Sequence, residues 1–126
     1  MIGELDRGSA PVEFSLVSVL LVAVALSVLQ VAFIAHVRAV AIDSAIAGAA
    51  YAALADASDS EGVARTKNLL ALGMGSNLVR SVAIVDSAIA GRRSTEVTVE
   101  LSVPMIGPWL PVAEMSVRGR AFREVP

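Results

Sequence analysis

The chain has no cysteine, a single histidine (His36) and few aromatic residues (4% of 126). The lack of cysteine excludes a disulfide framework and thiolate catalysis. His36 has no carboxylate at ligand spacing, so it does not predict a metal site, and no Ser/His/Asp set can be assembled around it. No glycine-rich phosphate loop precedes an expected helix. The residues therefore give no support for an enzyme, a cofactor, a metal or a small-molecule substrate.

A surplus of one charge sign is also lacking. The formal net charge is -2, and basic and acidic side chains are equal in number after Ala35. A nucleic-acid-binding protein normally presents a field of positive potential. We therefore expect no nucleic-acid partner.

Charge is absent altogether from Phe14 to Ala35. These residues, about 22 of them, span about 33 Å as a helix, and a hydrocarbon core is about 30 Å thick. The mean hydropathy of the whole chain, +0.71, is high for a small soluble domain. We expect residues 9–37 to form one transmembrane helix and residues 38–126 to form a small outer domain. Arg7 and Arg38 flank the apolar run on either side, so charge does not set its orientation.

One carboxylate, Glu13, lies at the mouth of the apolar run, in the segment GSAPVEF of residues 8–14. A charged side chain inside a membrane is costly and is normally paired. Alternatively, Glu13 sits at headgroup level, where a helix N-terminus favours negative charge. The spacing of Gly8, Glu13 and Phe14 favours a processing motif over this simpler interpretation.

Residues 7–17 resemble the N-terminal motif of the TadE-like family of minor pilins (pseudopilins) in tight-adherence, or Flp-type, pilus systems. The similarity is specific over Arg7–Val17 and looser to about Tyr51. The resemblance implies that residues 1–8 are a prepilin-like leader. It also implies that a membrane-embedded prepilin peptidase cuts between Gly8 and Ser9, and that Glu13 and Phe14 serve recognition and assembly.

Cleavage there would leave an amine on Ser9, about 6 Å of helical rise from Glu13. In an assembly, the amine of one subunit would neutralise Glu13 of its neighbour and fix the axial register of the two helices. Pro11 would lie in the first turn of the processed helix, where its missing N–H costs little.

Later segments predict an α+β fold in which the first helix, from about Ala10 to Ala55, continues beyond the membrane. Small residues recur on one face of its second half, and we expect this face to cover the core of its own domain. A capping box at Ser58 and Glu61 begins a second helix over residues 59–72. Period-two patterns predict three antiparallel strands at about 78–88, 95–103 and 115–125, with a turn at residues 90–93. Glu96 and Glu100 are expected opposite arginines of the third strand.

Two features of the outer domain allow a bland and a sharper interpretation. The loop at residues 104–111 (PMIGPWLP) holds Ile106 and Trp109, which we expect to cover the small core. Alternatively, this loop enters the outer leaflet or docks a partner pilin. The acidic residues Asp56, Asp59 and Glu61 do not have EF-hand spacing, so capping and solvation are favoured over calcium binding.

The resemblance therefore implies a minor pilin of a tight-adherence pilus, held in the cytoplasmic (inner) membrane with its C-terminal domain outside the cytoplasm. The partners that it implies are the membrane, the prepilin peptidase, other pilins and the assembly platform. Two alternatives stay open. One is a single-pass anchored binding domain that never polymerises, and the other is a secreted protein whose signal is cleaved near Ala39–Ala41.

Overall fold

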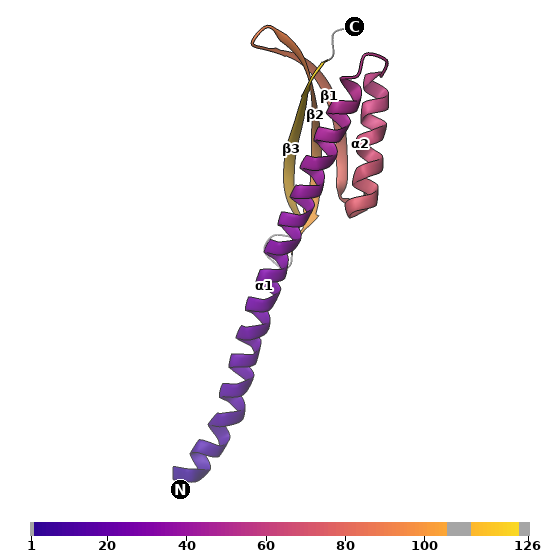
Figure 1. Cartoon of the computed structure of the whole chain (residues 1–126). Coiled ribbons are helices and arrows are strands. Elements are labelled where there is room, and N and C mark those ends of the chain that lie inside the picture. Colours follow the sequence, from indigo (N-terminus) through magenta and orange to yellow (C-terminus); the bar gives the residue numbers. More distant parts are fainter. Residues whose placement is uncertain (1, 106–111, 124–126) are drawn as a thin grey trace. The chain divides into compact units, whose positions relative to one another are not determined.

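The computed structural model describes residues 2–105 and 112–123, with side chains from residue 9 onward. The described elements are helix α1 (Ile2–Ala52), helix α2 (Asp59–Met74), the short 3-10 helix η1 (Ser76–Leu78) and the strands β1 (Val79–Ile89), β2 (Arg92–Pro104) and β3 (Val112–Phe122) (Figure 1). The predicted α+β class is confirmed. The chain divides into two compact units, Met1–Phe33 and Ile34–Pro126, and α1 contributes residues to both.

Helix α1 begins at Ile2, earlier than the predicted start near Ala10. Leu, Glu and Arg in the head of the chain are good helix formers, so the helix continues through Gly8 and Pro11. It ends at Ala52 rather than near Ala55. The backbone tightens there, because the N–H of Leu54 donates to the carbonyl of Tyr51, three residues back, at 3.2 Å. This turn starts the reversal into α2.

Helix α2 begins with the predicted capping box. The backbone N–H of Glu61 donates to Ser58 Oγ at 3.3 Å, and the backbone N–H of Ser58 donates to Glu61 Oε2 at 2.7 Å. Both donors would otherwise be unsatisfied at the helix start. The helix ends at Met74, two residues past the expected end, and Gly75 then adopts a φ of +84°, which favours glycine.

The described strands form one antiparallel sheet in the order β1-β2-β3. The loop between β1 and β2 contains only Ala90 and Gly91, with φ values of +50° and +78°. A two-residue hairpin loop with both residues at positive φ matches the right-handed twist of the strands. Arg92 and Arg93, which the sequence placed in this turn, therefore belong to β2.

Strand β3 starts at Val112 and ends at Phe122, about three residues before the predicted limits. Pairing with β2 sets these bounds, because Val112 lies opposite Pro104 and Phe122 lies opposite Ser94. The start at Val112 was not predictable from local pattern, since it directly follows the proline-rich residues 104–111. Strand β1 spans residues 79–89, whereas residues 78–88 were predicted, and Leu78 belongs to η1.

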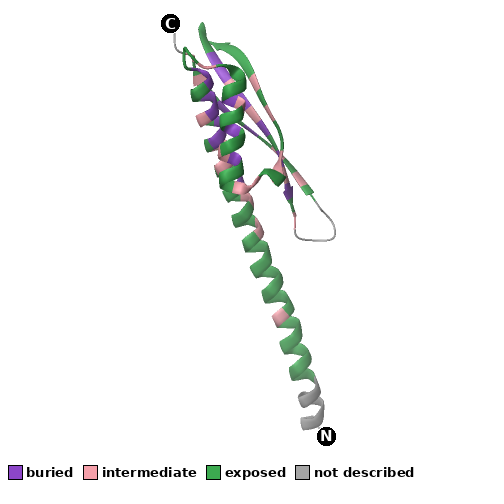
Figure 2. Cartoon of the chain, turned by 90° about the vertical axis from the view of Figure 1, so that its right-hand side faces the viewer, coloured by how far each residue is buried: buried purple, intermediate pink, exposed green. Residues whose placement is uncertain are grey.

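The core of the second unit lies between the sheet and the helices (Figure 2). One face of β2 is fully covered, with Val97, Val99, Leu101 and Val103 at 1% exposure or less. The small-residue face of α1 is buried with them, as predicted, through Val37, Ala41, Ala45, Ala49 and Ala52. Leu70 is the large buried side chain of α2.

Glycines allow the backbones in this core to approach closely. A Cβ atom on Gly119 of β3 would collide with backbone atoms of Ala45 and Ile46 of α1. A Cβ atom on Gly48 of α1 would collide with the side chain of Thr66 of α2. The Thr66 hydroxyl is satisfied inside its own helix, where it donates to the carbonyl of Gly62 at 2.9 Å. Small residues at 45, 48 and 119 therefore set how near the helices lie to the sheet and to each other.

We predict that Gly119→Ala lowers the free energy of unfolding by about 1–3 kcal/mol, because overpacking must push backbone away from backbone. The measurement is unfolding of the full chain in detergent, followed by circular dichroism. Ser116→Ala, at an exposed position of the same strand, is the control and should change stability by less than about 0.5 kcal/mol. Equal stability of Gly119→Ala and the parent chain would contradict this packing.

Candidate functional site

The predicted cleavage point, between Gly8 and Ser9, lies within the first turns of α1. Two residues near it weaken a helix. Glycine costs about 1 kcal/mol relative to alanine in a helix interior, and proline costs about 3 kcal/mol. Pro11 is an interior residue of the uncut helix, so it removes one backbone hydrogen bond there. After cleavage at Gly8 it would be the third residue of the chain, where that hydrogen bond is not required.

Glu13 lies one helical turn after Ser9 and is exposed. Among the residues whose side chains the structure describes, none forms an ion pair with it. The carboxylate is thus placed on an apolar helix, and no counter-ion for it lies among the described side chains.

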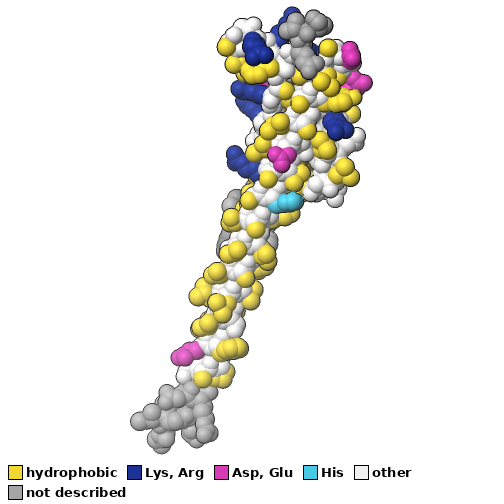
Figure 3. Space-filling model, in the orientation of Figure 1, with side chains coloured by type: hydrophobic (Ala, Val, Ile, Leu, Met, Phe, Trp, Pro, Cys, Tyr) yellow, Lys and Arg dark blue, Asp and Glu magenta, His cyan; other side chains and the backbone are white. Residues whose placement is uncertain are grey.

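The residues after Glu13 expose apolar side chains in every direction around α1. Phe14 is 75% exposed, and valines and leucines along the next five turns are similarly uncovered. Figure 3 shows these hydrophobic side chains along the N-terminal part of the helix. A helix that is apolar all round needs a membrane or other helices to cover it. By length and composition, Ser9–Ala52 contains a stretch suited to crossing a membrane.

Serine hydroxyls in this stretch are satisfied within the helix. Ser15 donates to the carbonyl of Pro11 at 2.8 Å, Ser18 to that of Phe14 at 2.8 Å and Ser27 to that of Ala23 at 2.7 Å. Each bond reaches four residues back, so no hydroxyl needs water. This arrangement suits a lipid environment, where an unsatisfied polar group is costly. Glu13 is therefore the exceptional side chain of the stretch.

The predicted docking residues Ile106 and Trp109 lie outside the described residues. The acidic cluster is described, and two of its three members, Asp59 and Glu61, form polar contacts. Glu61 caps α2 through Ser58, and Asp59 forms an ion pair with Arg123 at 3.6 Å. Within residues 9–105 and 112–123, no group of three or more metal-ligating side chains converges.

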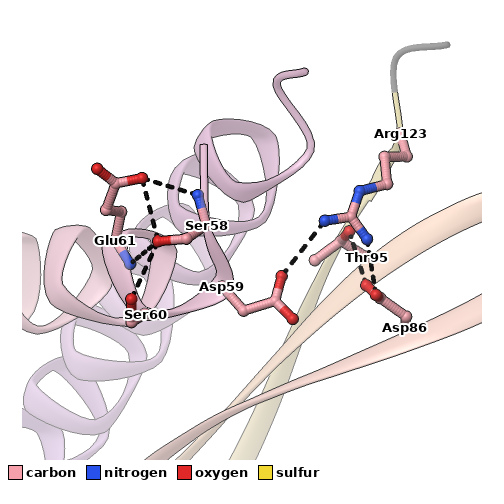
Figure 4. A network of polar contacts seen from close by, with 7 residues as sticks. All are labelled: Ser58, Asp59, Ser60, Glu61, Asp86, Thr95 and Arg123. Atoms are coloured by element: carbon pink, nitrogen blue, oxygen red, sulfur yellow. Dashed lines mark hydrogen bonds and ion pairs between the residues drawn. The ribbon is translucent and has the colours of Figure 1, made fainter. Parts of the chain in front are cut away.

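Arg123 connects three elements at one end of the second unit, a role that the sequence did not reveal (Figure 4). Its guanidinium donates to Asp86 of β1 at 2.7 Å and pairs with Asp59 of α2. Thr95 of β2 donates to the same Asp86 at 3.2 Å. The partners are far apart in the chain, so no local spacing could indicate this link.

Charged side chains also cross the sheet on the face away from the helices. Glu96 lies opposite Arg120 and pairs with both Arg120 and Arg118, as expected. Glu100 differs from its prediction, because it lies opposite Ser116 and accepts a hydrogen bond from Ser81 at 3.0 Å. In this register Glu96 is the β2 residue opposite Arg120, and Glu100 lies four residues further along β2.

No protein-family model, curated protein or solved structure matches this chain. The interpretation of the N-terminal segment therefore depends on its residues and on the geometry of α1.

We predict that Arg123→Ala lowers the free energy of unfolding by about 1 kcal/mol at low salt and by less at high salt, since its ion pairs are partly exposed. Arg123→Lys should lower the free energy of unfolding by less than Arg123→Ala, because lysine keeps the positive charge although it lacks the planar guanidinium.

The measurement is denaturant unfolding of the full chain in detergent, carried out on both Arg123 variants at low and at high salt. Arg93→Ala, an exposed neighbour whose carbonyl accepts from the Arg123 N–H, is the control and should change stability by less than about 0.5 kcal/mol. A salt-independent loss in Arg123→Ala would contradict an electrostatic link.

Proposed function

We propose that this protein is a minor pilin, or pseudopilin, of a tight-adherence pilus. It is inserted into the membrane as a precursor, is cut after Gly8 by a prepilin peptidase, and assembles through packing of α1 helices. The observation that carries the proposal is Glu13, a carboxylate on an uncovered apolar helix with no ion-pair partner among the described side chains.

Assembly would supply a counter-ion for the Glu13 carboxylate. The processed N-terminus is an amine on Ser9, about 6 Å along the helix from Glu13. Residues four apart lie on the same helix face, so this amine lies near Glu13 of its own chain. On an adjacent helix offset along its axis, it would equally lie near Glu13 of the neighbouring subunit, and we propose that this second pairing holds the assembly together. Such a pair relieves the cost of a membrane carboxylate, which is about 2.5–3.5 kcal/mol at the bilayer centre and less near the surface, where Glu13 is expected.

The weak point of α1 supports the position of the cut. Gly8 and Pro11 together make the helix easy to unwind around the Gly8–Ser9 bond, and a peptidase needs an extended strand of substrate. Removal of the leader then leaves Pro11 in the first turn, where it is compatible with a stable helix. The same sequence therefore suits both the substrate and the processed subunit.

The second unit supports a role outside the membrane. Its core holds residues of the second half of α1 against the sheet. In the described part of the chain, no three His, Asp or Glu side chains form a group that could hold a metal ion. We propose that chemistry is done on this protein by the peptidase and that the protein itself serves as a building block.

The test is replacement of the carboxylate. We predict that Glu13→Gln chains are inserted and processed normally but fail to join filaments, because the neutral amide cannot hold the partner amine. Glu13→Asp is the matched control and should assemble, since it keeps the charge at nearly the same place.

The measurement is the amount of this protein in sheared surface filaments relative to the membrane fraction. Normal incorporation of Glu13→Gln would refute the role of the ion pair. Filaments formed in cells that lack this protein altogether, with unchanged number and length, would refute the proposed function itself.

A further inference from the structure

The outer face of the sheet, opposite the helices, is basic and apolar near the β1–β2 hairpin. Near the hairpin, the described part of this face carries Arg92, Arg118 and Arg120, and Glu96 lies among them. Glu100 and Glu114 lie on the same face, further from the hairpin. Arg118 and Arg120 keep 62% and 55% of their side chains exposed although both pair with Glu96. The formal charge of this patch is therefore positive.

Apolar side chains accompany these arginines. Phe122 is 52% exposed and lies 4.6 Å from the Arg92 guanidinium, and Val85 on β1 is 56% exposed. Ile89 is 37% exposed on the same face. We call this surface the outer patch, formed by Val85, Ile89, Arg92, Arg118, Arg120 and Phe122.

A second surface of opposite charge lies at the connection between α1 and α2. It combines exposed acidic residues with exposed apolar ones, Tyr51 at 38% and Leu54 at 42%. We call residues 51–61 the acidic connection, whose carboxylates are Asp56, Asp59 and Glu61. Asp56 has no ion-pair partner in the described part of the chain, and Arg65 lies over the Tyr51 ring at 5.8 Å.

These two surfaces belong to the same end of the second unit but to opposite faces. Arg123 shows that they share an end, because its side chain pairs with Asp59 and its N–H donates to the carbonyl of Arg93 beside the hairpin. The helices cover one face of the sheet (Figure 2). The strand register places the outer patch on the other face. A chain therefore cannot bring its own two surfaces together.

We propose that a second copy of this chain docks its acidic connection onto the outer patch. The charges are complementary, and each surface carries large apolar side chains that would be covered by the other. The contact joins different surfaces of two identical chains, so each subunit keeps one free surface of each kind and the arrangement can repeat. The inference extends the assembly role proposed above from the membrane helices to the outer domain.

The composition of the outer patch favours a protein partner over an anionic polymer. Glu96 lies between Arg118 and Arg120 and partly neutralises them. Val85, Ile89 and Phe122 offer contact area that phosphates or sugar acids cannot use. Protein interfaces characteristically combine arginine and aromatic anchors with a polar rim.

Site-specific disulfide crosslinking tests the contact. Because the chain has no cysteine, only the introduced cysteines can form the crosslink. Two differently tagged full-length chains are co-expressed, one with Val85→Cys on the outer patch and one with Ala55→Cys in the acidic connection. Both positions are exposed. Mild oxidation in membranes should give a disulfide dimer that carries both tags. Leu72→Cys replaces Ala55→Cys as the control, since it is 85% exposed on α2 but about 16 Å further along the helix from Glu61.

Charge exchange adds a second readout. Arg118→Glu in the Val85→Cys chain should lower the yield of mixed dimer about fivefold, the effect of losing one favourable surface pair. Asp56→Arg in the Ala55→Cys chain should restore most of that yield. A mere folding defect in Arg118→Glu would not be repaired by a change in the other chain.

A dimer between two Val85→Cys chains in place of the mixed one, or a mixed yield no higher than that of the Leu72→Cys control, overturns the proposal. A mixed yield that Asp56→Arg fails to restore also overturns it. These outcomes are separate from those of the assembly role. Chains that are processed and join filaments without a 55–85 crosslink would refute only the docking, and crosslinked chains that never join filaments would refute only the assembly role.

Discussion

The carboxylate of Glu13 lies on an exposed apolar helix, and none of the described side chains forms an ion pair with it. The hydroxyls of Ser15, Ser18 and Ser27 on the same apolar stretch each donate to a carbonyl four residues back. Glu13 cannot be satisfied in that way, because a carboxylate accepts hydrogen bonds and the backbone N–H groups of a helix are already used. An amine from a neighbouring chain is the counter-ion that removal of a leader would create.

The second unit depends on a different constraint, the close approach of backbones in a core made largely of small side chains. Gly119 beneath Ala45 and Gly48 beside Thr66 allow α1 to contact both the sheet and α2. Alanines supply little apolar area each, so stability depends on this fit and on polar links at the periphery. Arg123 supplies such a link by joining α2 and β1 at the end where the helix connection and the hairpin meet.

Local patterns in the sequence predicted much of this architecture. The period-two alternation from Val97 to Val103 gave the buried face of β2, and the spacing of Ser58 and Glu61 gave the start of α2. Long-range pairing was not predictable in the same way. The limits of β3 follow from its register with β2, and the contacts of Arg123 join segments that no periodicity relates. For the candidate site, the chain gave the positions of Gly8 and Glu13, and the structure added that the helix runs through Gly8 and Pro11.

The mass of the mature N-terminal peptide, measured on the protein purified from membranes of its own cells, tests the central claim most directly. We expect a mature chain that begins at Ser9 with a free amine. In a Gly8→Lys variant the residue before the cut is changed, so we expect the mature chain to retain residues 1–8. A mature chain that begins at Met1 or Ile2 would contradict the account, since Glu13 would then have no new amine to pair with. A chain that begins near Ala39–Ala41 would contradict it as well, because the whole apolar helix would be lost.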